Sequence, residues 1–140
     1  MERAKATAWA LALAGLIPFA GCALMAVLGA IPGFDWTGAL MAYAAVILSF
    51  LGGARWGGEL AGQNPSPARL ILSNLPAIVA WLALVSVAAP AALRLGVLAA
   101  GLALVWLWDR GPSTPWYRAL RTTATVGAVL SLGLAALAGT

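Results

Sequence analysis

The sequence has almost none of the residues on which protein catalysis and metal binding depend. It contains no histidine, one cysteine and four acidic residues among its 140 positions. A hydrolytic triad therefore lacks its usual base, and zinc or haem lacks its usual ligands. A single cysteine also excludes a disulfide scaffold. We expect a protein that is not an enzyme and that has no resident metal or cofactor.

Charge is scarce as well: charged residues make up 9% of the chain and hydrophobic residues 63%, with a mean hydropathy of +0.95. A soluble domain carries about 25% charged residues. A chain this short cannot hide so much apolar surface inside itself, so its outer surface must face lipid. The basic residues are scattered rather than clustered, which argues against a nucleic-acid partner.

Five apolar runs are long enough to cross about 30 Å of hydrocarbon as helices. They lack the alternating pattern of membrane β-barrel strands. We therefore predict an all-α, polytopic bundle of five transmembrane helices that forms one domain over residues 1–140. The predicted helices cover approximately residues 8–29, 38–61, 67–88, 91–108 and 116–138.

The connections between these runs contain ordinary signals for helix ends. Asp35 or Thr37 can cap the second helix, and Ser66 precedes a proline at the expected start of the third. An oxygen-bearing cap followed by proline at the first helical position is a common way to begin a helix.

The basic residues predict how the chain is oriented, because Lys and Arg accumulate on the cytoplasmic side of a membrane. Arg94 is the only one expected on the opposite side. This distribution predicts a cytoplasmic N-terminus and an external C-terminus. The tryptophans near the helix ends fit interfacial aromatic belts. The basic residues expected on the cytoplasmic side are Arg3, Lys5, Arg55, Arg69, Arg110, Arg118 and Arg121.

Two charged residues lie deeper than orientation alone requires. Arg55 and Glu59 are four positions apart on one helix face, where they can pair. Arg55 lies about six residues, or roughly 9 Å, inside the expected helix end. One interpretation is that both side chains reach toward cytoplasmic water while Trp56 anchors the interface. The other is a polar pocket in the cytoplasmic leaflet, with further walls from Ser73, Asn74, Asp109, Arg121 and Thr122.

The same segment is rich in glycine, which lets a second helix approach closely. Such a helix could belong to the same bundle or to a partner protein, and the spacing leaves both possibilities open. A weaker motif joins Gly127 and Ser131 on the last helix. The helix-packing candidates of the second helix are Gly52, Gly53, Gly57, Gly58 and Gly62.

Several of these segments together resemble the transmembrane protein 69-like family, a domain-of-unknown-function family (number 3429) of small bacterial and mitochondrial membrane proteins. The resemblance covers nearly the whole chain and implies the fold and the membrane compartment, which we expect to be the bacterial inner membrane, but it implies no activity. It rests on Leu16-Ile17-Pro18-Phe19, Tyr43, the run from Ile47 to Gly53, Trp56-Gly57, Pro76 with Trp81, Pro115-Trp116-Tyr117-Arg118 and Leu120-Arg121.

Two classes of function remain after these exclusions. The first, which we favour at this point, is an accessory or assembly subunit that packs against a larger membrane complex or forms a homo-oligomer. The second is a module that binds a lipid, a quinone or another amphiphile in a pocket around Arg55. A small transporter has less support, because an odd number of helices gives no simple inverted repeat. Membrane lipids are the partners expected in every case.

Overall fold

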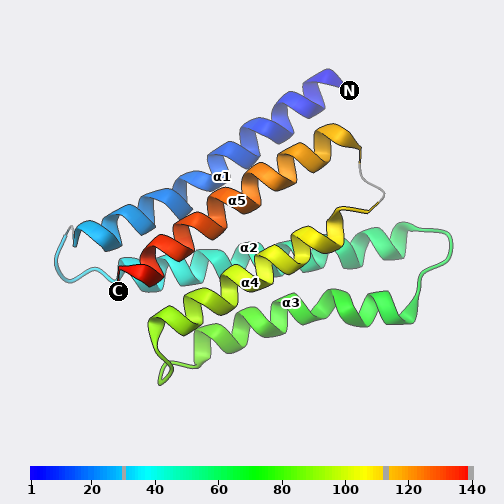
Figure 1. Ribbon diagram of the computed structural model, residues 1–140. Coiled ribbons are helices and arrows are strands. Elements are labelled where there is room, and N and C mark those ends of the chain that lie inside the picture. Colours follow the sequence, from blue (N-terminus) through cyan, green and yellow to red (C-terminus); the bar gives the residue numbers. More distant parts are fainter. Residues whose placement is uncertain (30, 112–113, 139–140) are drawn as a thin grey trace.

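The computed structural model describes residues 1–29, 31–111 and 114–138. Over these residues the chain is a bundle of five helices without a strand, and each helix is long and apolar enough to cross a membrane. The predicted fold class is therefore confirmed (Figure 1). The helices are α1 (Glu2–Leu28), α2 (Trp36–Ala61), α3 (Pro67–Val85), α4 (Ala91–Asp109) and α5 (Pro115–Leu137).

Two helix boundaries differ from the prediction by three residues or more. The helix α1 begins at Glu2 rather than near residue 8, because its charged first turns are made of good helix formers and continue beyond the apolar run. The helix α3 ends at Val85 rather than near residue 88. There Arg94 of α4 donates to the carbonyl oxygens of Ala83 and Leu84, over 2.7 and 2.8 Å, and satisfies carbonyls in the last turn of α3.

Two predicted caps are present. The side chain of Asp35 accepts a hydrogen bond from the Gly38 amide over 2.8 Å at the start of α2. Ser66 accepts one from the Arg69 amide over 3.4 Å at the start of α3, directly before the proline at the first helical position. Local sequence therefore determines where these two helices begin.

The helices run alternately up and down, so that every second connection lies at the same end of the bundle (Figure 1). The first turns of α1, α3 and α5 lie at one end together with the last turns of α2 and α4. We call this the charged end. Residues from α2, α4 and α5 that are far apart in sequence meet there.

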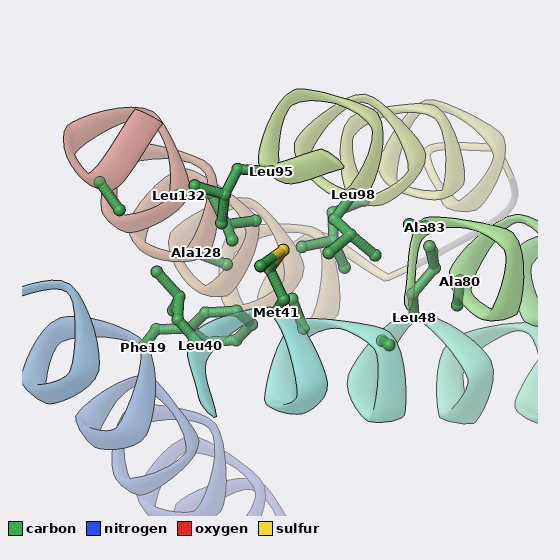
Figure 2. Close-up of a cluster of buried hydrophobic side chains, with 14 of the residues drawn as sticks. Phe19, Leu40, Met41, Leu48, Ala80, Ala83, Leu95, Leu98, Ala128 and Leu132 are labelled. Atoms are coloured by element: carbon green, nitrogen blue, oxygen red, sulfur yellow. The ribbon is translucent and has the colours of Figure 1, made fainter. Parts of the chain in front are cut away.

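The core lies between the helices and is almost entirely aliphatic. Figure 2 shows Leu40 and Met41 of α2 facing side chains from α4 and α5, and Leu48 further along α2, beside α3. The outer surface is apolar too: Phe50 and Leu130 are each 67% exposed. This distribution fits a bundle surrounded by hydrocarbon, where apolar side chains belong on both the inside and the outside.

Three glycines allow the helices to come close together. A Cβ added to Gly52 would lie 2.7 Å from the carbonyl oxygen of Ser73, so α2 and α3 touch through their backbones there. A Cβ at Gly101 would lie 2.8 Å from Leu48, and one at Gly127 would lie 2.8 Å from Leu16. Small residues at these points permit the contacts that hold membrane helices together.

Candidate functional site

Asp109, the last residue of α4, lies between arginines from two other helices. Nη1 of Arg55 on α2 donates to Oδ1 of Asp109 over 3.2 Å. Nε of Arg121 on α5 donates to Oδ2 over 3.1 Å. Each carboxylate oxygen thus serves one guanidinium group. We call Arg55, Asp109 and Arg121 the charged cluster; it joins three helices at the charged end.

The charged cluster is largely hidden from solvent. The side chains of Arg121 and Asp109 are 8% and 10% exposed, and that of Arg55 is 29% exposed. Nη1 of Arg121 also donates to Oγ1 of Thr125, one turn further along α5, over 3.3 Å. Its Nη2 lies 3.1 Å from Oδ2 of Asp109 and is fully buried, and it makes no directional hydrogen bond to any described residue. Arg121 is therefore a buried cation held by its neighbours.

A tryptophan supports Arg55 from one face. The guanidinium carbon of Arg55 lies 4.1 Å from the centre of the Trp108 ring, a cation–π contact. Asp109, the next residue of α4, holds the edge of the same guanidinium group. The side chain is thus fixed by α4 rather than extended freely toward water.

Glu59 pairs with Arg69 of α3 and not with Arg55, so the expected pairing along the face of α2 is wrong. Nε of Arg69 donates to Oε2 of Glu59 over 2.9 Å, and the Ser66 amide donates to Oε1 over 2.7 Å. The reason is geometric: α2 ends shortly after Glu59, and the short connection brings the start of α3 beside its carboxylate. An Arg placed before Glu on a helix is also the weaker orientation for a pair.

Three of the residues considered for the pocket lie elsewhere. Ser73 is buried and Asn74 is exposed, and both donate to the Leu70 carbonyl of their own helix, over 2.7 and 2.9 Å. Trp56 is 45% exposed on the outer surface. Backbone carbonyls within reach satisfy these polar side chains on α3 without any pocket.

Thr122 lies beside the charged cluster and ties α5 to α4. Its hydroxyl accepts a hydrogen bond from Nε1 of Trp106 over 2.9 Å. The guanidinium carbon of Arg110 lies 5.0 Å from the centre of the same indole ring. Trp106 and Trp108 therefore each contact an arginine at the charged end. The sequence had predicted only that these tryptophans lie at the membrane interface.

A cavity of about 530 Å³ opens beside the charged cluster. Tyr117 was not singled out by sequence as a site residue, although it belongs to the Trp-Tyr-Arg segment at the start of α5. Thr125 was missed too, and its position four residues after Arg121 is the signal that could have revealed it. We call the cavity of about 530 Å³ the charged cavity; its walls are Leu51, Ala54, Arg55, Gly58, Glu59, Arg69, Asp109 and Tyr117.

The remaining glycines of α2 make no close contact with another helix. A Cβ added at Gly53, Gly57 or Gly58 would meet nothing within 4 Å, and Gly53 and Gly57 are exposed. A Cβ at Gly62 would meet only carbonyl oxygens of its own segment, at the C-terminal cap of α2. Of the glycines considered on this helix, Gly52 alone packs within the described part of the bundle.

The profile of the family described as "Protein of unknown function (DUF3429)" matches residues 4–137. The chain belongs to this family. Its members' activity is unknown, so membership fixes the kind of protein and leaves the role of the charged cluster open. The resemblance drawn from the sequence motifs is confirmed.

Two relatives carry the name transmembrane protein 69. The one from Xenopus tropicalis is 39% identical over 129 residues, which cover 87% of this chain and 50% of the relative. The one from Mus musculus is 35% identical over 128 residues, which cover 85% and 51%. This chain therefore spans about half the length of both relatives. No solved structure matches it significantly. The family and the five long helices together show a multi-pass membrane protein.

Proposed function

We propose that this protein is a non-catalytic membrane module that binds an anionic amphiphile in the charged cavity. The observation that carries the proposal is a charge imbalance. In the described part of the chain, three guanidinium groups gather around two carboxylates at this site. Arg69 is matched by Glu59, but Arg55 and Arg121 share Asp109. Among the described residues, one positive charge is left over.

An excess charge is costly in this setting. Arg121 and Asp109 are almost fully buried, and removing an ion from water costs several kcal/mol or more even after relaxation. A bound anion beside Arg55 and Arg121 would neutralise the surplus and supply acceptors for N–H groups. The planar guanidinium group also matches phosphate and carboxylate geometry with two parallel hydrogen bonds.

The surroundings favour an amphiphile over a small polar anion. The charged cavity is bounded by apolar atoms of Leu51, Ala54 and Tyr117 as well as by charges. It lies within the ends of membrane-spanning helices, where lipid headgroups meet hydrocarbon. With the orientation expected from the basic residues, the bound molecule would come from the cytoplasmic leaflet of the bacterial inner membrane.

A non-catalytic role agrees with the chemistry present. The chain has no histidine, and no group of three or more potential metal ligands gathers among the described residues. The cluster offers N–H donors and fixed charge, which bind an anion, and both carboxylates of the cavity are held in ion pairs with arginines.

The test compares two arginines at the same end of the bundle. Each purified variant is placed in nanodiscs of equal parts phosphatidylcholine and phosphatidylglycerol, and the lipids that stay bound are measured by native mass spectrometry. Arg55→Ala should lower the retained phosphatidylglycerol several-fold. Arg110→Ala removes the same charge outside the charged cavity and should leave retention unchanged. Equal retention by wild type and Arg55→Ala would refute the proposal.

A second candidate, the accessory subunit, is favoured by the outer face of α2. Gly53 and Gly57 are exposed and meet nothing within 4 Å, although each glycine in a helix costs about 0.8–1 kcal/mol relative to alanine. No contact within the described bundle requires them. Close approach by a helix of another subunit would explain their small size.

This candidate is tested by recovery of partners from native membranes in mild detergent. If this face is an interface, a stoichiometric partner or a second copy of the chain should be recovered with the wild-type protein and lost with Gly57→Leu. Gly21→Leu is the control, because Gly21 is also exposed and unhindered but lies on α1. Recovery of the wild-type protein alone, as a monomer, would refute the accessory role.

A further inference from the structure

An apolar cavity of about 390 Å³ adjoins the charged cavity. The two share Leu51 and Tyr117 as wall residues. Arg121 lines the apolar cavity while its guanidinium group contacts Asp109, a wall of the charged one. We call this second space the tail groove. Most of its walls come from α1, α2 and α5, and they include Ala8, Leu11, Ala12, Gly15, Leu16, Phe19, Ile47, Phe50, Ala124, Thr125 and Ala128.

The path of α1 explains why the tail groove exists. Near the middle of the bundle α1 and α2 are tied together, since Tyr43 Oη donates to the Gly15 carbonyl over 2.8 Å and the Phe19 ring meets the Tyr43 ring at 4.9 Å. Toward the charged end the two helices diverge while α1 continues alongside α5 (Figure 1). The tail groove lies along this stretch, since its walls on α1 run from Ala8 to Phe19.

Small side chains keep the tail groove empty. The wall contributed by α1 presents Ala8, Ala12 and Gly15, and the wall contributed by α5 presents Ala124 and Ala128. These positions recur at intervals of three or four residues, so they lie along one face of each helix. None of them carries a side chain long enough to fill the space between the diverging helices.

Arg121 is the decisive feature of the groove. It is the only charged residue among the described walls, and its side chain is 8% exposed. Its Nη2 is buried and makes no directional hydrogen bond within the described part of the chain. A molecule whose alkyl chain lies along the groove would therefore bring its headgroup to Arg121 and, past Leu51 and Tyr117, to Arg55.

The geometry points to a membrane lipid with an anionic headgroup, which enters sideways between α1 and α2 and leaves one alkyl chain in the tail groove. This inference rests on the proposed function and specifies the class of ligand and its route. A soluble anion arriving from water would need only the charged cavity. A second apolar cavity, between α3 and α4, has no charged residue among its walls and so provides no comparable headgroup contact.

The experiment fills the groove without changing any charge. Ala12→Phe places a ring in the groove, and Ala14→Phe is the matched control, since Ala14 is exposed on the same helix and lines neither cavity. Retention of long-chain phosphatidylglycerol, short-chain phosphatidylglycerol and inorganic phosphate is compared by native mass spectrometry and by competition. Circular dichroism checks that each variant folds. If Ala12→Phe does not fold, Ala124→Phe fills the groove from α5 instead.

The expected result is a several-fold loss of long-chain phosphatidylglycerol in Ala12→Phe, no loss in Ala14→Phe, and weak competition by inorganic phosphate in wild type. If Ala12→Phe retains long-chain phosphatidylglycerol as wild type does while Arg55→Ala loses it, the tail groove does not hold the alkyl chain. The proposed function would still stand. Phosphate competing as well as the lipid would assign the site to a soluble anion. No loss in either variant would overturn both.

Discussion

Arg55 and Asp109 are separated by 54 positions in the sequence, yet Nη1 of one donates to Oδ1 of the other over 3.2 Å. The contact fastens the last turns of α2 to the end of α4, and Arg121 completes it from α5. Asp109 thereby offsets part of the charge of two arginines. The stability of the charged end should depend on this one carboxylate more than on any other.

Asp109→Asn should destabilise the protein by about 3 kcal/mol, because breaking a buried ion pair leaves uncompensated charge in a poorly screened site. The measurement is the free energy of unfolding in detergent, followed by circular dichroism. Asp35→Asn is the control: it also removes an acidic charge, but asparagine caps a helix as well as aspartate does, so little change is expected. Equal effects of the two substitutions would contradict the role of Asp109.

Glu59→Gln should cost clearly less stability than Asp109→Asn. Its partner Arg69 has a side chain 54% exposed, so the released cation can be solvated, and the amide oxygen of glutamine can still accept from the Ser66 amide. The same unfolding measurement applies. A loss as large as that of Asp109→Asn would show that Glu59 belongs to the charged cluster after all.

Replacing two adjacent glycines of α2 by alanine should change the stability of the protein in opposite directions. Gly52→Ala places a Cβ 2.7 Å from the backbone oxygen of Ser73, and the resulting separation of α2 and α3 should cost about 1–3 kcal/mol. Gly53→Ala meets nothing within 4 Å and should gain up to about 1 kcal/mol from better helix propensity. Thermal unfolding of the two variants side by side provides the comparison. Higher stability of both variants would contradict the close contact at Gly52.

The predicted orientation can be tested with single cysteines in a Cys22→Ala background. Gln63→Cys lies in the α2–α3 connection and Val87→Cys in the α3–α4 connection, and both positions are exposed. In intact cells a membrane-impermeant thiol reagent should label Val87→Cys and spare Gln63→Cys, because positively charged connections stay in the cytoplasm. The reverse labelling pattern would invert the assignment.

Much of the fold was predictable because it depends on local sequence. Apolar run length determines which segments cross a membrane, and Asp35 and Ser66 begin their helices through contacts within a few residues. The prediction was weaker for pairings across helices. Arg55 had Glu59 one turn away, but Asp109 was the partner that tertiary packing placed at its guanidinium edge.

The candidate site shows the same division. The sequence pointed to a polar region around Arg55 with Asp109 and Arg121 among its walls, and these three residues do meet. It also suggested Ser73 and Asn74, which bond to their own helix. Helix rotation decides which side chains share a space, and a single sequence defines that rotation poorly where both faces of a helix are apolar.

The sequence by itself determined the solvent and the number of crossings, since hydrophobic length and composition act without regard to neighbours, and its motifs indicated the family that the profile match shows. Only the tertiary structure decided that Arg55 and Arg121 share one carboxylate, and that α1 diverges from α2 to leave a groove leading to them. Charge scarcity was a property of the chain. The gathering of Arg55, Asp109 and Arg121 beside the tail groove results from packing, because side chains from α2, α4 and α5 meet only when the helices are assembled.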